Sequence, residues 1–299
     1  MQTSAKWLAT AFVLPSLLLL GGEAQADDTT RGFVFQPEAK VAALRPTLAR
    51  PMKLNFKGDK ARLIAPVFTR SGLFAAAPKK LHGLSKFEGD VTHDPVYDPS
   101  IDAWFAWSNG MIVEIKADGR LPVIIEDPPG HDFDIRMSNG LAMFRDPNKN
   151  EIVLMRLNRN AQGERERTVL HRGIEFFNPR FSPGGDKVVV STDGNREGRL
   201  IVTSLVTMRA EDVGVGYQPT WSPDGKKLYF MDFENDGYNF TASKLFARDL
   251  ERGATQKLFE SREVIATQPA ISRDGRQVAF YDEAAQDVAV AELPEMEVR

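Results

Sequence analysis

The chain has 299 residues, of which 42% are hydrophobic and 26% are charged, and its formal net charge is −3. This balance is typical of a soluble globular protein with a sizeable core, and it provides no basic field for nucleic acid. The sequence contains no cysteine, which excludes disulfide bonds, thiolate metal sites and a lipidated N-terminal cysteine.

Residues 1–26 have the pattern of a secretory signal peptide. Lys6 supplies a positive charge, an apolar run follows at 7–20, and Ala-Gln-Ala at 24–26 is a small-x-small cleavage pattern. The alternative is an uncleaved anchor helix, although the apolar run is short for a bilayer. We therefore expect a mature chain that begins at Asp27 in the periplasm, with no membrane span after cleavage.

A sequence template recurs in the second half of the chain. Each copy has a proline near the start of an expected strand, then a turn of the Ser-Pro-Asp-Gly type, then a β-rich run. The three clear copies are NPRFSPGGDKVVVST (178–192), QPTWSPDGKKLYFMDF (218–233) and QPAISRDGRQVAFYD (268–282). Looser copies lie at 94–107 and 134–144, and a weak one at 55–68. Repeats of about 40–50 residues indicate a repeat architecture.

Each unit is expected to form three or four short antiparallel strands, and no helical pattern separates the units. A bulky residue ends the first strand of each unit; these residues are Tyr97, Met137, Phe181, Trp221 and Ile271. We expect Trp221 to be buried between units. The pattern predicts an all-β fold, a β-propeller of six blades over 53–299, with five blades as the alternative because the first unit is weak. The last unit lacks room for a fourth strand, so a segment near 53–68 is expected to complete it.

The three clear copies resemble the repeats of TolB-type six-bladed propellers. The resemblance is good over 174–293 and loose over 91–173, and it says nothing specific about 27–52. TolB-type proteins carry an α/β domain before the propeller, which the short segment at 27–52 cannot supply. The chain therefore resembles a propeller-only relative, with a signal peptide (1–26), an N-terminal arm (27–52) and a propeller (53–299). The resemblance implies binding of a protein or ligand at the channel mouth.

The residue before each repeat proline, or its counterpart, is expected at the mouth of the central channel. These residues are Asp94, Asp134, Asn178, Gln218 and Gln268. All five are polar, and convergent polar groups are typical of a binding site. The alternative is that they only hydrate the channel.

Two histidines lie near this predicted ring. His93 precedes Asp94, and His131 is close to Asp132 and Asp134. Imidazoles and carboxylates can together bind zinc or manganese. The alternative is that both histidines bond to neighbouring carboxylates in loops, so we expect no cofactor and keep a divalent metal as the alternative.

Two functions are compatible with these features. The sequence has no G-x-S-x-G, P-loop or H-E-x-x-H motif, and three of the five ring residues are amides. We therefore expect a monomeric, non-enzymatic scaffold that binds an envelope or periplasmic protein. The alternative is a propeller hydrolase or lyase with a metal or acid–base site at the channel mouth. The arm at 27–52 either lies over the propeller or is presented to a partner as an added strand.

Overall fold

The computed structural model describes residues 47–48, 65–77, 80–81, 95–116, 120–173, 175–194, 197–237 and 239–294. All of them belong to one compact unit, Phe33–Arg299. The predicted signal peptide and most of the predicted arm lie outside the described residues, so both remain predictions. The described part of the chain contains no helix that is long and apolar enough to span a membrane.

The described residues form antiparallel sheets built from strands consecutive in the sequence, except that β1 joins the last sheet. The first three sheets are β2 (Ala65–Thr69), β3 (Gly72–Ala77) and β4 (Lys80–Leu81); β5 (Val96–Asp98), β6 (Ala103–Ser108), β7 (Met111–Ile115) and β8 (Val123–Ile125); and β9 (Phe133–Arg136), β10 (Leu141–Asp146), β11 (Glu151–Arg159) and β12 (Arg165–Arg172). The next two are β13 (Phe176–Phe181), β14 (Lys187–Gly194), β15 (Glu197–Ser204) and β16 (Ala210–Val215); and β17 (Tyr217–Trp221), β18 (Lys227–Asn235), β19 (Phe240–Asp249) and β20 (Thr255–Ser261). The last contains β21 (Ala266–Ile271), β22 (Gln277–Asp282) and β23 (Asp287–Glu292), to which β1 (Thr47–Leu48) adds a fourth strand.

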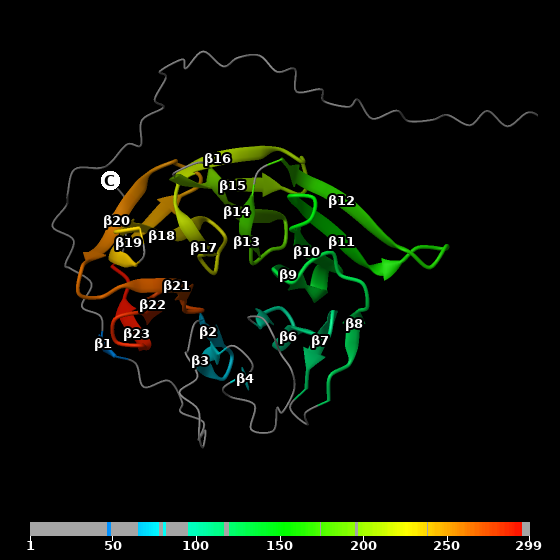
Figure 1. Cartoon of the computed structure of the whole chain (residues 1–299), viewed down its shortest axis with the longest axis horizontal. Helices are drawn as coiled ribbons and strands as arrows, with labels where there is room; N and C mark the ends of the chain where they lie inside the picture. The colour runs from blue at the N-terminus through cyan, green and yellow to red at the C-terminus, as the bar shows by residue number, and fades with distance from the viewer. Residues whose placement is uncertain are drawn as a thin grey trace, which may run out of the picture. The chain divides into compact units, whose positions relative to one another are not determined.

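The sheets are arranged as the blades of a β-propeller. Figure 1 shows β2, β9, β13, β17 and β21, each the first strand of its sheet, around a common centre. Neighbouring sheets pack face to face, and β2 packs against β21, so the first sheet meets the last. The predicted all-β propeller is confirmed. Within the described residues, five blades have four strands, and the weak first unit forms a sheet of three.

The last blade is completed by a strand from the N-terminal side, as expected, but from a different segment. Thr47 pairs with Val290 and Leu48 with Ala289. The expected segment was 53–68. Residues 65–69 are not available for this role because they form β2, the innermost strand of their own sheet, which pairs with β3. The closing strand therefore lies within the range 27–52 that was assigned to the arm.

The repeated turn has the same geometry in the three clear copies. In each copy the glycine N–H donates to the carbonyl of the serine three residues earlier, at 2.9 Å. These glycines, at 185, 225 and 275, have φ of 70° or 71°, a left-handed conformation that glycine adopts at low cost. The serine hydroxyl accepts the next strand's first N–H, for example that of Lys227 at 2.8 Å. The template therefore specifies a tight connection between the first and second strands of a blade.

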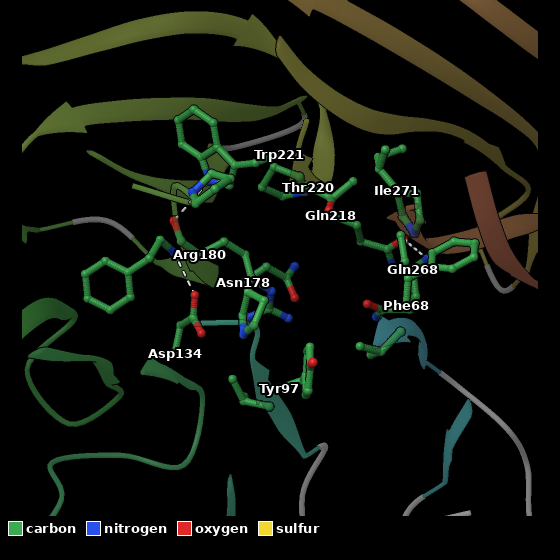
Figure 2. Close-up of a pocket in the computed structure, with 18 of the residues that line it drawn as sticks. Phe68, Tyr97, Asp134, Asn178, Arg180, Gln218, Thr220, Trp221, Gln268 and Ile271 are labelled. Atoms are coloured by element: carbon green, nitrogen blue, oxygen red, sulfur yellow. Dashed lines mark hydrogen bonds between the residues drawn. The ribbon is translucent and has the colours of Figure 1, made fainter. Parts of the chain in front are cut away.

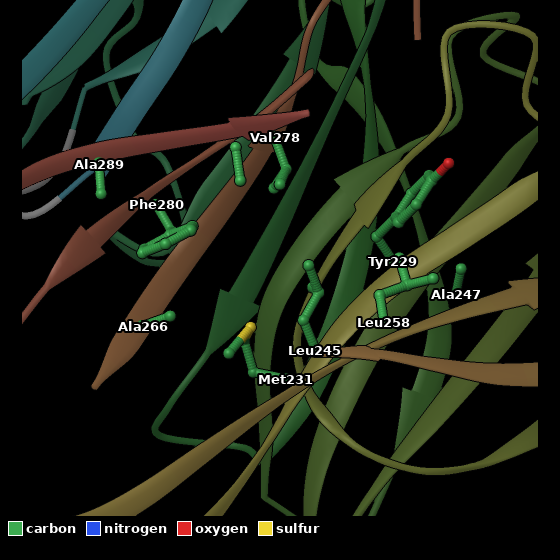
Figure 3. Packing of buried hydrophobic residues seen from close by; sticks show 10 residues of the cluster. Tyr229, Met231, Leu245, Ala247, Leu258, Ala266, Val278, Phe280 and Ala289 are labelled. Atoms are coloured by element: carbon green, nitrogen blue, oxygen red, sulfur yellow. The ribbon is translucent and has the colours of Figure 1, made fainter. Parts of the chain in front are cut away.

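The core consists of apolar layers between adjacent blades. Figure 3 shows one layer, in which Met231 and Leu245 of one blade pack with Phe280 of the next. Another layer contains Trp221, whose side chain is buried as expected. The Trp221 indole Nε1 donates to the Arg180 carbonyl at 3.3 Å, so this residue joins two blades by packing and by a hydrogen bond.

We predict that Trp221→Ala lowers the free energy of unfolding by about 3–5 kcal/mol, because it empties a large volume between blades. Trp221→Phe keeps most of the apolar contact and loses the indole hydrogen bond, so its cost should be smaller. Urea denaturation of both variants measures the difference. A loss below about 1 kcal/mol for the alanine variant would contradict the packing described here.

Candidate functional site

A cavity of about 750 Å³ occupies the centre of the propeller. The first strand of every sheet, or the segment next to it, contributes to its wall. Figure 2 shows Phe68, Tyr97, Asp134, Asn178, Gln218 and Gln268 around this space, with Trp221 and Ile271 behind them. A cavity of this size with mixed polar and apolar walls is typical of a ligand-binding site.

The three amide residues of the predicted ring have an unusual backbone. Asn178, Gln218 and Gln268 have φ of 50°, 49° and 52°. At each of these sites the strand pairing shifts, so that the amide residue and the following proline stand opposite a single residue of the second strand. This is a β-bulge, which redirects a side chain out of the regular alternation. The bulges place all three amides on the cavity wall.

Hydrogen bonds between blades orient this wall. The Gln218 side-chain oxygen accepts the backbone N–H of Gln268 at 2.8 Å. The Asp132 carboxylate accepts the backbone N–H of Asn178 at 3.2 Å. In both cases a side chain from one blade holds the left-handed residue of the next blade. The cavity wall and the contacts between blades therefore share the same atoms.

Asp134 lines the cavity but is placed differently from the three amides. Its strand, β9, has no proline and pairs continuously with β10, so no bulge redirects the Asp134 side chain. The carboxylate is buried and accepts the backbone N–H of Phe181 at 2.7 Å and of Ile135 at 2.8 Å. Burial raises the pKa of Asp134, although Arg136, Arg180 and these two N–H groups act in the opposite direction. Asp134 thus ties β9 to β13.

The predicted histidine pair is seen only in part. His131 lines the cavity, with its ring edge-on to Trp107 at a centroid distance of 6.1 Å. Burial, and then the charge of Arg145, lowers the pKa of His131. His93, the other histidine of the pair, and the neighbouring Asp94 lie outside the described residues. Among the residues described, no group of three or more His, Asp or Glu side chains could hold a metal ion, and the metal site stays a prediction.

The cavity wall also contains arginines, which the repeat pattern does not predict. Strand β9 ends at Arg136, whereas the repeat pattern predicts that it ends at Met137. The reason is a short 3₁₀ turn, η1 (Met137–Asn139), which follows the strand directly and replaces the longer repeat turn. The buried guanidinium of Arg136 donates to Asp98 at 3.2 Å and to the Phe181 carbonyl at 3.3 Å. Arg145 pairs with Glu175 and lies over the Phe177 ring, 4.6 Å from its centroid.

Arg180 and Arg273 are the other two arginines of the wall. They form no ion pair within the described part of the chain, in contrast to Arg136 and Arg145. Arg180 is half-buried on β13, whereas Arg273 is exposed in the repeat turn after β21. The position of Arg180, directly after a repeat proline, is the signal that could have identified it.

No family model matches the sequence, and no curated protein matches it either. Solved structures resemble the fold. An oligogalacturonate lyase in complex with manganese has a TM-score of 0.52 at 11% identity, covering 85% of this chain and 97% of the lyase. A nidogen/laminin complex has 0.50 at 12%, covering 79% and 91%. A putative TolB from Agrobacterium tumefaciens has 0.48 at 13%, covering 68% and 82%. The first two likenesses show the β-propeller fold, and identities this low show nothing further.

We predict that Asp134→Ala lowers the free energy of unfolding by about 1–3 kcal/mol, because it leaves two buried N–H groups without an acceptor. Asp134→Asn keeps one acceptor oxygen, so it should cost less than the alanine variant. Denaturant titration of the two variants and the wild type measures both losses. An alanine variant as stable as the wild type would show that this carboxylate does not hold the two strands together.

Proposed function

We propose that the protein is an exported, non-enzymatic scaffold that binds a partner protein through the central cavity of its propeller. The observation that carries the proposal is the set of three amides from consecutive blades, each held in a left-handed conformation and each on the same cavity wall. A left-handed residue other than glycine costs roughly 1–2 kcal/mol. Strain of this kind concentrates at functional sites.

The chemistry of the wall favours binding over catalysis. Amides do not titrate, and they donate and accept hydrogen bonds at any physiological pH. Burial and a hydrogen bond to Asp102 raise the pKa of Tyr97 to about 12, so its hydroxyl stays protonated at neutral pH and is not available as a general base. The Asp134 oxygens both accept backbone N–H groups. The amides are therefore the groups suited to recognising a peptide or another hydrogen-bonding ligand.

A metal-dependent or acid–base hydrolase or lyase is the second candidate, and His131 is the observation that favours it. Its lowered pKa keeps the imidazole neutral, which is the form that binds a metal or accepts a proton. The likeness to a lyase in complex with manganese concerns the fold alone. One zinc or manganese ion per chain after purification without chelator, lost in His131→Ala, would favour this candidate.

The proposed location is the periplasm, and it rests on the signal-peptide pattern of residues 1–26. The repeat resembles that of TolB-type propellers, which supports an envelope protein as the partner. We propose a monomer, in which the arm at 27–52 either lies over the propeller or is presented to the partner as an added strand. The pairing of Thr47 and Leu48 with β23 supports an arm whose end is anchored to the last blade.

The test is a quantitative pull-down from the envelope fraction with the double variant Gln218→Ala/Gln268→Ala. We predict about a tenfold loss of the specific partner, since two lost hydrogen bonds together correspond to roughly 1.4 kcal/mol. Gln162→Ala is the matched control, because Gln162 is an exposed residue in the turn between β11 and β12. Melting temperatures show whether the variants remain folded. Equal capture of every partner by the folded double variant would refute the proposal.

A further inference from the structure

We propose that the partner inserts a carboxylate-bearing side chain into the central cavity and that Arg180 binds this carboxylate. The inference rests on the proposed binding function and adds the chemical class of the bound group. It depends on a balance of hydrogen-bond donors and acceptors on the wall.

Several hydrogen-bond acceptors on the wall are used by the protein itself. Both oxygens of Asp134 accept backbone N–H groups, from Phe181 and Ile135. The side-chain oxygen of Gln218 accepts the N–H of Gln268. Because this bond orients the carboxamide of Gln218, its NH₂ group keeps two donor positions for a ligand. These three oxygens are therefore engaged within the protein, whereas the NH₂ group of Gln218 is a donor that a ligand can use.

Arg180 is the strongest of these donors. Its Nη1 donates to the Pro179 carbonyl at 2.7 Å, and within the described residues its other guanidinium N–H groups have no partner. The Asp134 carboxylate feels the charge of Arg180, but the two form no ion pair within the described residues, and each Asp134 oxygen already accepts a backbone N–H. A guanidinium has five donors in a fixed planar arrangement, which matches the two oxygens of a carboxylate.

The backbone at Arg180 is held from two neighbouring blades. The Trp221 indole donates to the Arg180 carbonyl at 3.3 Å. On the other side, Asp134 accepts the N–H of Phe181, the next residue in the strand. A donor whose backbone is fixed in this way loses less conformational freedom on binding, which favours affinity.

The rest of the wall favours a peptide as the source of the carboxylate. Phe68, Trp221 and Ile271 add apolar surface to the cavity wall, and Gln268 presents an amide that can pair with a peptide bond. The volume of about 750 Å³ is large enough for a short segment of chain. A free small carboxylate would use Arg180 but would leave these groups without contacts.

The experiment compares three probes by isothermal titration calorimetry on the full-length protein. The probes are acetyl-Ala-Asp-Ala-amide, its asparagine counterpart and sodium acetate, each at millimolar concentration. We expect the acidic peptide to bind at least about tenfold more tightly than the asparagine peptide, a difference of roughly 1.4 kcal/mol. We expect Arg180→Gln to abolish this preference and Arg180→Lys to reduce it. Arg209→Gln, at an exposed arginine between β15 and β16 that does not line the cavity, should leave it unchanged.

Several results would overturn the proposal. These are equal binding of the two peptides, no binding of either, or a preference that survives Arg180→Gln in a protein with an unchanged melting temperature. Acetate binding as tightly as the acidic peptide would overturn the peptide as the source. If the peptides fail but Gln218→Ala/Gln268→Ala still loses the partner in the pull-down, the carboxylate is wrong and the binding function stands. If the pull-down also shows no loss, both are wrong.

Discussion

The bulge at the repeat proline is the constraint on which the rest of the structure depends. A proline has no N–H to donate, so it is well tolerated at a bulge, where the regular pairing of the innermost strand is interrupted. Two residues then stand opposite one, and the residue before the proline becomes left-handed, as at Asn178, Gln218 and Gln268. The same bulge in three consecutive blades turns three amides toward one cavity. In a regular strand, the side chain at this position would instead point to one of the two faces of its blade.

The contacts that join the blades also determine the chemistry of the cavity. Gln218 and Asp134 each use acceptor oxygens to hold a neighbouring blade. Arg136 and Asp98 form a buried ion pair at 3.2 Å, and a buried pair of this kind is costly to break on one side only. These pairings leave donors, chiefly Arg180, on the wall. Assembly of the propeller and the proposed recognition of a ligand therefore depend on the same hydrogen-bond network.

Much of the fold could be predicted from the sequence, because a proline and a glycine at fixed spacing have direct backbone consequences. The three clear copies showed where the first strand and its turn lie. Asp134 could not be placed in the same way, since β9 has no proline and so no bulge. The closing strand, Thr47–Leu48, is too short to have a pattern of its own. The sequence also could not show that Arg136 and Arg145 form ion pairs while Arg180 forms none within the described residues, because the partners of Arg136 and Arg145 come from other segments of the chain.

The left-handed backbone before the repeat proline is the central claim, and a pair of substitutions at Gln268 tests it most directly. The side chain of Gln268 donates no hydrogen bond within the described residues, so both substitutions remove little besides the side chain itself. In a left-handed conformation, Gln268→Gly should be more stable than Gln268→Ala by about 1 kcal/mol. In a regular strand, as at Thr220 in β17, glycine should instead be less stable than alanine by about 0.5–1 kcal/mol. Urea denaturation of the four variants gives both differences. The account predicts opposite signs at the two positions, and a Gln268→Ala variant at least as stable as Gln268→Gly would contradict it.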